Sequence, residues 1–332
     1  MVFSSIFKNE IKNFLEIIKS TKARNTYLHY RNSLQEFDLY LSSIEYKDKK
    51  LNREIIDCWI ATIKGKPSTV QGKVVHIKYF LRYLNEIDIY AEMPDLPIFR
   101  SDYIAYQFSD DEIEKIYEYI DNLKDHYRVL PSNRNLFYEM PVIFRILLCC
   151  GTRLGETLAL KVGDIDFSND CILIVNNTKR KKQRIVPMNH NLAEIIKKYC
   201  IRMGIIENPN HLLFPSSKND EKINDNKKIS SPFHTILKRL GIYDRAPNSS
   251  ENAIHERGPC IHCLRHAFAF RALKQNEEIH SMDVMVPYLS IYLGHERLDE
   301  TEKYLKYSPD LRLDVTKLFE DYSSSLFPGV LP

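Results

Sequence analysis

The sequence predicts a mainly α-helical protein with a small β-sheet, in which a helical N-terminal domain precedes an α+β domain. Three observations support this fold class. Apolar residues recur at helical spacing from Ile6 to about Leu84, two prolines interrupt residues 93–100, and short strand-like stretches follow at residues 171–175 and 184–187. With 332 residues and 44% hydrophobic side chains, the chain is long enough to bury two cores.

The first domain, residues 1–92, is expected to contain four helices. Its apolar repeat begins with Phe7 and Ile11 and continues at the same helical spacing. Polar turn sequences separate the helices, and we expect Thr21 and Ser68 to be N-caps of the helices that follow them. The last of these helices also carries cationic side chains, some of which should fall on its solvent side and could face phosphates, namely Lys73, Lys78 and Arg82.

Residues 93–106 are expected to form a linker, because prolines favour an extended chain. The second domain, residues 107–332, opens with Ser109 and Glu112 at the spacing of a capping box, which predicts a helix starting near Asp110. A second helix through residues 140–150, a β-hairpin formed by the two strand-like stretches, and further helices up to a C-terminal helical tail should follow. Polar stretches at residues 216–228 and 244–258 are expected to be exposed loops.

Cysteine usage and the apolar segments predict a cytoplasmic protein. The seven cysteines are scattered and odd in number, which fits reduced thiols better than a disulfide framework. Lys8, Glu10 and Lys12 interrupt the first apolar residues, so this end does not resemble a signal peptide. The longest apolar stretch, residues 140–150, contains Arg145 and is too short to cross a bilayer, so we expect no membrane association. The net charge of +3 leans only slightly toward anionic partners.

Four stretches of the second domain carry side chains suited to phosphate chemistry, and each also has a simpler explanation. In the first, Gly151 can end an apolar helix and leave Arg153 close to Glu156, where the arginine is either half of a structural ion pair or an anion ligand. The second, TKRKKQR at residues 178–184, is either a solvated cationic turn or the source of a lysine that holds a phosphate or donates a proton.

The third stretch contains His262 and Arg265, which are three residues apart and therefore lie on one helix face. Two donors on one face suit a phosphate whose charge grows in the transition state. The alternative is a zinc-binding module, since Cys260 and Cys263 form a CxxC pair, although no second CxxC exists in the chain. The fourth stretch, LGH at residues 293–295 followed by Tyr304, is weak by itself, because the chain has twenty tyrosines.

The order and spacing of these stretches resemble the active-site boxes of the tyrosine recombinase, or phage integrase, family. The matching segments are GTRLGE at 151–156, TK at 178–179 before RIVP at 184–187, HCLRH at 262–266, and LGH at 293–295 with Tyr304 nine residues on. Tyr307 lies one turn beyond Tyr304, and the nine-residue spacing favours Tyr304. VPYLSIYLGH at 286–295 is similar to the versions found in transposons and other mobile elements, and the first domain resembles the family's helical core-binding (SAM-like) domain.

The resemblance implies a tyrosine recombinase catalytic domain in which Tyr304 attacks the scissile phosphate and forms a 3′-phosphotyrosine. It implies that arginines clamp the phosphate, histidines add hydrogen bonds or proton transfer, a lysine protonates the departing 5′-oxygen, and a glutamate supports the arginine site. The implied catalytic set is Arg153, Lys179, His262, Arg265, His295 and Tyr304, with Glu156 supporting it. The expected DNA-binding set is Arg24, Tyr27, Arg31, Lys73, Lys78, Arg82, Lys181 and Arg184.

The resemblance further implies a site-specific recombinase that needs no metal ion or other cofactor, because guanidinium groups and a lysine neutralise the phosphate charge. Its implied partners are double-stranded DNA with inverted-repeat sites, further copies of itself in a tetrameric synaptic complex, and accessory DNA-bending proteins. The C-terminal tail either docks on a neighbouring subunit or folds onto its own domain. Two other functions remain open, a DNA-binding protein of the same fold without catalysis and a type IB topoisomerase-like enzyme that relaxes DNA.

Overall fold

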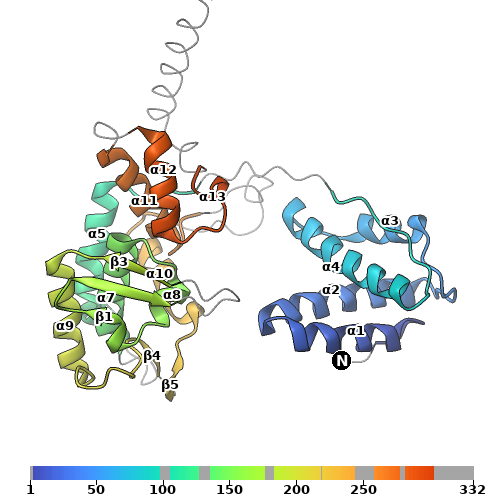
Figure 1. The fold of residues 1–332 in the computed structure, drawn as a ribbon, viewed down its shortest axis with the longest axis horizontal. Helices are drawn as coiled ribbons and strands as arrows, with labels where there is room; N and C mark the ends of the chain where they lie inside the picture. Colours follow the sequence, from blue (N-terminus) through green and yellow to red (C-terminus); the bar gives the residue numbers. More distant parts are fainter. Residues whose placement is uncertain are drawn as a thin grey trace, which may run out of the picture. The chain divides into compact units, whose positions relative to one another are not determined.

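The computed structural model describes residues 3–97, 105–126, 135–175, 183–217, 219–243, 258–276 and 281–302. The chain divides into two compact units, Met1–Asp102 and Tyr103–Pro332 (Figure 1). None of the helices in these described ranges combines the length and the apolar character that crossing a bilayer requires.

The first unit contains the four helices expected from the apolar repeat. They are α1 (Lys8–Thr21), α2 (Arg24–Ser43), α3 (Arg53–Thr62) and α4 (Pro67–Glu86). Helices α1, α2 and α4 pack against one another, and Trp59 of α3 meets Phe37 of α2 edge-on at a ring-centroid distance of 5.1 Å. The buried side chains form one core, which explains why the apolar period is so regular in this part of the sequence.

The two N-caps expected in this unit are wrong. Thr21 is the last residue of α1, and its hydroxyl donates to the carbonyl oxygen of Ile17 in the same helix, so it is not free to cap α2. Helix α4 begins one residue before Ser68, because Pro67 takes the first helical position. Proline suits this position, since its missing N–H would have no partner there and its φ is already helical.

The second unit combines helices with two small antiparallel sheets. Its helices are α5 (Asp110–Asp121), α6 (Leu123–His126), α7 (Leu136–Cys150), α8 (Leu154–Leu158), the 3₁₀ turn η2 (Val162–Asp164), α9 (His190–Met203), α10 (Asn226–Arg239), α11 (Cys263–Asn276), α12 (Met282–Leu293) and α13 (Asp299–Glu302). The capping box before α5 is confirmed, because Ser109 Oγ accepts from the backbone N–H of Glu112 at 3.1 Å and the Glu112 carboxylate accepts from that of Ser109 at 2.9 Å.

The predicted β-hairpin is present as β2 (Cys171–Val175) and β3 (Gln183–Pro187), which pair with each other antiparallel. The short strand β1 (Ile165–Asp166) pairs antiparallel with the other edge of β2. A second pair, β4 (Pro215–Ser216) and β5 (Asn219–Ile223), is followed directly by α10. The loop expected at residues 216–228 is therefore wrong: polar side chains dominate there because β5 is exposed along its length. The other expected loop lies largely outside the described residues.

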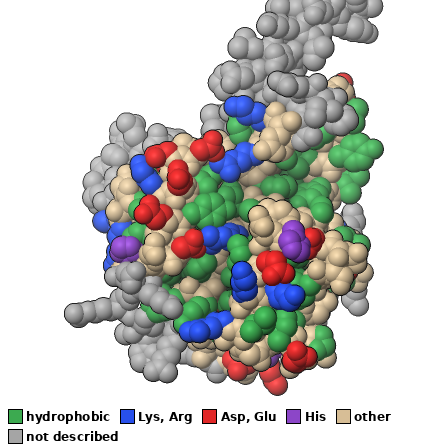
Figure 2. Space-filling view, turned by 90° about the vertical axis from the view of Figure 1, so that its left-hand side faces the viewer, with side chains coloured by type: hydrophobic (Ala, Val, Ile, Leu, Met, Phe, Trp, Pro, Cys, Tyr) green, Lys and Arg blue, Asp and Glu red, His purple; other side chains and the backbone are tan. Residues whose placement is uncertain are grey.

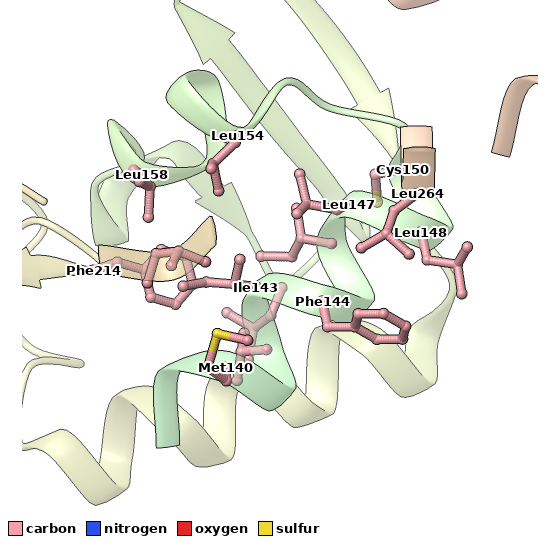
Figure 3. Packing of buried hydrophobic residues seen from close by; sticks show 14 of the residues in the cluster. Met140, Ile143, Phe144, Leu147, Leu148, Cys150, Leu154, Leu158, Phe214 and Leu264 are labelled. Atoms are coloured by element: carbon pink, nitrogen blue, oxygen red, sulfur yellow. The ribbon is translucent and has the colours of Figure 1, made fainter. Parts of the chain in front are cut away.

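Helix α7 forms the centre of the second unit and packs against α5, α8, α9 and α11. Figure 3 shows its apolar side chains, among them Ile143, Phe144 and Leu147, gathered against Leu158 of α8, Phe214 and Leu264 of α11. Gly151 ends α7 in the left-handed conformation with a φ of 59°, as the sequence predicts. Helix α12 contacts both α11 and α13 (Figure 1), and α11 also contacts α7. Arg265 near the start of α11 binds carbonyl oxygens at the ends of α7 and α12, so these three helix ends lie close together.

Candidate active site

Arg153 and Glu156 follow α7 directly and lie close together, as the sequence predicts. Arg153 immediately precedes α8, and Glu156 lies in the first turn of that helix. The Glu156 carboxylate accepts hydrogen bonds from both the backbone N–H and the Nη1 of Arg153, each at 2.9 Å. The Arg153 side chain is 37% exposed while that of Glu156 is 8% exposed, so the arginine presents its charge to solvent over a buried carboxylate.

Arg184 on β3 binds the same carboxylate from the other side. Its Nη1 donates to Glu156 Oε1 at 3.1 Å and its Nη2 donates to Oε2 at 2.7 Å. The side chain is only 11% exposed. The sequence assigns Arg184 to the DNA-binding set, but the structure places it behind Arg153 in a two-pronged ion pair.

Glu156 stays ionised although it is buried. Burial by itself would raise its pKa, but the hydrogen bonds from Arg184 and from the Arg153 backbone, together with the charges of both arginines, lower the pKa to about 2. Arg265 adds a third guanidinium, with its Nη1 3.9 Å from Glu156 Oε2. Three permanently charged arginines and one carboxylate leave this cluster with a net charge of 3 − 1 = +2.

The guanidinium group of Arg265, a residue of α11, lies at the C-terminal ends of α7 and α12. Its Nη1 donates to the carbonyl oxygen of Gly151, after α7, and its Nη2 donates to that of Leu293, the last residue of α12, both at 2.7 Å. These carbonyls lack partners within their own helices and lie at the negative ends of the helix dipoles, so a buried guanidinium satisfies both. The Arg265 side chain is 1% exposed, and Arg153 is therefore the more accessible guanidinium.

His262 lies in the turn just before α11, and His266 lies in the first turn of that helix. Their rings meet edge-on, with centroids 4.8 Å apart. Partial removal from water and the neighbouring charges of Arg265 and Arg153 lower the pKa of His262. Burial and the nearby His262 lower the pKa of His266 to about 3. Both imidazoles are therefore neutral at pH 7 and can donate or accept a hydrogen bond. The sequence-derived set omits His266, whose four-residue spacing from His262 is the signal that could have identified it.

His295 follows Gly294, which ends α12 in the left-handed conformation at a φ of 66°. Burial first, and then the charges of Arg265 and Arg153, lower the pKa of His295 to about 4. Its Nδ1 lies 2.6 Å from the hydroxyl of Thr301 in α13, and Thr301 is completely buried. Sequence reasoning missed Thr301. The only signal for it is that Thr301 carries the single hydroxyl between His295 and Tyr304.

The structure therefore brings the described members of the expected catalytic set, together with Arg184, into one cluster. Backbone groups join its parts, since Arg153 Nη2 donates to the carbonyl oxygen of Gly294 at 3.2 Å. The members that the structure describes are Arg153, Glu156, Arg184, His262, Arg265 and His295. Lys179, Lys181 and Tyr304 lie outside the described residues. Figure 2 shows one face of the molecule, on which basic and acidic side chains lie interspersed in the described part.

The CxxC pair brings its two sulfur atoms close, with 3.7 Å between Cys260 Sγ and Cys263 Sγ. Within the described ranges, no group of three or more cysteine, histidine or acidic side chains is arranged to hold a metal ion. A zinc site needs four ligands in a tetrahedron, so this pair alone does not form one.

The expected DNA-binding residues of the first unit differ in their surroundings. Lys73 forms an ion pair with Glu36 of α2 at 2.5 Å, which neutralises part of its charge. Arg82 is exposed and lies over the ring of Tyr79, with its guanidinium carbon 5.5 Å from the ring centroid. Arg24 is also exposed, while the remaining three are half-buried, namely Tyr27, Arg31 and Lys78.

Two bacterial recombinases are similar in sequence to nearly the whole chain. A putative integrase/recombinase, y4rB of Sinorhizobium fredii, is 24% identical over 95% of this chain and 98% of its own length. The tyrosine recombinase XerC of Bacillus subtilis is 23% identical over 92% of this chain and 93% of its own length.

Among solved structures, the XerH recombinase bound to its difH substrate has the same fold. It has a TM-score of 0.64 at 17% identity, covering 93% of this chain and 84% of that protein. A lambda integrase dimer bound to a core site also gives 0.64, at 13% identity, over 89% of this chain and 76% of that protein. The sequence profile of the phage integrase family matches residues 107–310. Since this match spans more than half of the chain, the protein belongs to the phage integrase family of tyrosine recombinases.

Proposed function

We propose that this protein is a site-specific DNA recombinase that cleaves and rejoins DNA strands through a covalent bond between Tyr304 and a backbone phosphate. The observation that carries the proposal is the cluster of Arg153, Arg184 and Arg265 around Glu156, with its net charge of +2 beside neutral histidines. Fixed positive charge next to hydrogen-bond donors is what a phosphate needs as it gains charge in a pentacovalent transition state. Family membership supports the same conclusion.

In the proposed reaction, the phenolic oxygen of Tyr304 loses its proton and attacks the phosphorus. The bond from phosphorus to the 5′-oxygen breaks, and Lys179 donates a proton to that leaving oxygen. Arg153 and Arg265 hold the non-bridging oxygens, and His262 and His295 donate hydrogen bonds or accept the phenolic proton. One phosphodiester is exchanged for another, so the reverse attack by a 5′-hydroxyl rejoins the strand without an external energy source.

We propose double-stranded DNA with inverted repeats as the substrate, with the protein acting as an assembly of several copies. Solved structures of lambda integrase bound to DNA and of the Tn1549 transposon integrase in complex with circular intermediate DNA support a DNA substrate. The mobile-element resemblance of residues 286–295 supports integration, excision or transposition as the biological reaction. Because guanidinium groups neutralise the phosphate charge, cleavage should proceed in the presence of EDTA.

The experiment uses nicked duplexes made from the DNA sequence that flanks the gene. After cleavage the small leaving fragment diffuses away, so rejoining cannot occur and the covalent adduct accumulates. The wild type should give an adduct that survives denaturing electrophoresis. Tyr304→Phe should abolish the adduct and retain DNA binding in a gel-shift assay, whereas the matched variant Tyr307→Phe should still form it. An undiminished adduct in Tyr304→Phe would refute the assignment. Relaxation of plasmids lacking any flanking sequence would instead indicate a topoisomerase-like enzyme.

A further inference from the structure

Arg184 stands apart from the other arginines of the cluster because both of its terminal nitrogens donate to the Glu156 carboxylate. We propose that Arg184 is a positioning residue of the recombination reaction: it holds the Glu156 carboxylate that orients Arg153, and it acts without contacting the DNA. The inference rests on the proposed function and replaces the DNA-contacting role expected from the sequence.

The hydrogen bonds at Glu156 carry the proposal. Each carboxylate oxygen accepts one hydrogen bond from each arginine: Oε1 accepts from Arg153 Nη1 and Arg184 Nη1, at 2.9 and 3.1 Å, and Oε2 accepts from the Arg153 backbone and Arg184 Nη2, at 2.9 and 2.7 Å. The carboxylate is therefore clamped from two sides. If Arg184 were lost, Glu156 could rotate about its last torsion angle, and Arg153 would lose its fixed acceptor.

Burial separates the roles of the two arginines. The Arg153 side chain is 37% exposed and can approach a phosphate, while the Arg184 side chain is 11% exposed and already uses both terminal nitrogens on Glu156. The 8% exposure of Glu156 makes the pairing necessary, because a buried carboxylate without a full set of partners is strongly destabilising. Arg184 thus supports Arg153 from inside the protein.

Arg184 also contacts the segment that carries His295. A Cβ atom built on Gly294 would lie 2.9 Å from Arg184 Nη1, so the guanidinium packs directly against that glycine. The carbonyl oxygen of the same glycine accepts from Arg153 Nη2 at 3.2 Å. The backbone just before His295 therefore lies against both guanidiniums, and a shift of Arg184 would displace Arg153 and His295 together.

The charge of Arg184 has a measurable consequence for pH dependence. Burial is the largest influence on the pKa of Glu156 and raises it, and the hydrogen bond from Arg184 is the foremost influence that lowers it to about 2. Without Arg184, Glu156 should take up a proton at a higher pH and lose acceptor capacity for Arg153. Cleavage by a variant lacking Arg184 should then decline as the pH falls from about 7 to about 5, a range in which the wild-type Glu156 remains ionised.

The test compares Arg184→Met and Arg184→Lys with the wild type in single-turnover cleavage of the nicked duplex. We expect Arg184→Met to reduce the cleavage rate of bound DNA by about 100-fold at pH 7, because the clamp aligns a phosphate ligand, and to change DNA affinity less than about threefold. The rate loss should grow toward acidic pH, and Arg184→Lys should recover part of it. Arg202→Met on α9, which removes the same charge away from the cluster, should leave rate and pH profile unchanged.

The outcomes that overturn the proposal are distinct from failure of the proposed function. A large loss of DNA affinity with a normal cleavage rate of bound DNA would show that Arg184 contacts DNA. NMR of the Glu156 carboxyl carbon measures the pKa of Glu156 without any activity assay. The positioning role requires this pKa to rise in Arg184→Met. An unchanged pKa would contradict the positioning role even if the wild type cleaves DNA. If the wild type forms no adduct while the titration shifts, the proposed function fails and the Arg184–Glu156 coupling stands. If Arg184→Met does not fold, Arg184→Lys decides by the same two measurements.

Discussion

The Nδ1 atom of His295, just after α12, and the hydroxyl of the completely buried Thr301 in α13 form a 2.6 Å hydrogen bond. Because His295 is neutral at pH 7, one of its two ring nitrogens carries a proton and the other does not. The hydrogen bond to Thr301 therefore fixes the orientation of the imidazole ring. It also influences which of the two ring nitrogens carries the proton.

Thr301→Val keeps the shape of the side chain and removes this hydrogen bond. We expect the cleavage rate to fall by about tenfold, which corresponds to the loss of one hydrogen bond of about 1.4 kcal/mol that orients a reacting group. Thr301→Ser should restore most of the rate, because it returns the hydroxyl. Single-turnover cleavage measures both variants, and equal rates for Val and wild type would show that His295 does not depend on Thr301.

The depressed histidine pKa values predict that the protein loses stability in mild acid. In the folded state the pKa of His295 is about 4 and that of His266 about 3, while an unfolded histidine titrates near 6.5. The unfolded chain thus binds more protons below pH 6.5, so the stability contributed by the neutral rings is present above that pH and is lost as the pH falls toward 4. Melting temperatures measured across this range should fall, and His266→Phe should make the decline shallower. An identical decline in His266→Phe would contradict the assignment.

Glu139 on α7 predicts a pH dependence of the opposite sign. Burial raises its pKa to about 7, against a partial lowering by Lys228, so the folded protein holds a proton that the unfolded chain releases near pH 4.5. The stability from this group is present below pH 4.5 and is lost as the pH rises through 7. Glu139→Gln should therefore stabilise the protein above pH 7, by up to about 3 kcal/mol. Denaturant unfolding at several pH values measures the effect, with the exposed Glu114→Gln on α5 as the control that should show none.

Substituting two helix-ending glycines, Gly151 and Gly204, would distinguish the cost of backbone strain from the cost of steric overlap. Gly151 and Gly204 both end helices with positive φ, of 59° and 68°. A Cβ atom on Gly204 would meet nothing within 4 Å, whereas on Gly151 it would lie 2.3 Å from the Phe268 ring. Gly204→Ala should cost about 1 kcal/mol from the left-handed conformation alone, and Gly151→Ala several kcal/mol because the ring must also move. Denaturant unfolding of the two variants compares them directly, and equal losses would show that Phe268 yields freely.

Local features were predictable because neighbouring residues determine them. The Ser109 capping box, the end of α7 at Gly151 and the two hairpin strands all depend on side chains a few positions apart. The N-cap expectations failed at the same scale, since Thr21 bonds within α1 and α4 begins at Pro67, two residues before the start that an N-cap at Ser68 would give. Competing local interactions decided these two positions, and a single sequence does not rank them.

The sequence by itself determined the two-part helical architecture, the hairpin and the set of residue types that suit phosphate chemistry, because periodicity and motif spacing are properties of the chain. Only the tertiary structure decided how these side chains are used. Arg184 and Glu156 are 28 positions apart, and Arg153 and Gly294 are 141 apart, so their contacts exist only after α7, β3 and α12 have packed together. Whether an arginine faces solvent or a buried carboxylate depends on that packing, which explains why the sequence alone did not predict the pairing of Arg184 with Glu156.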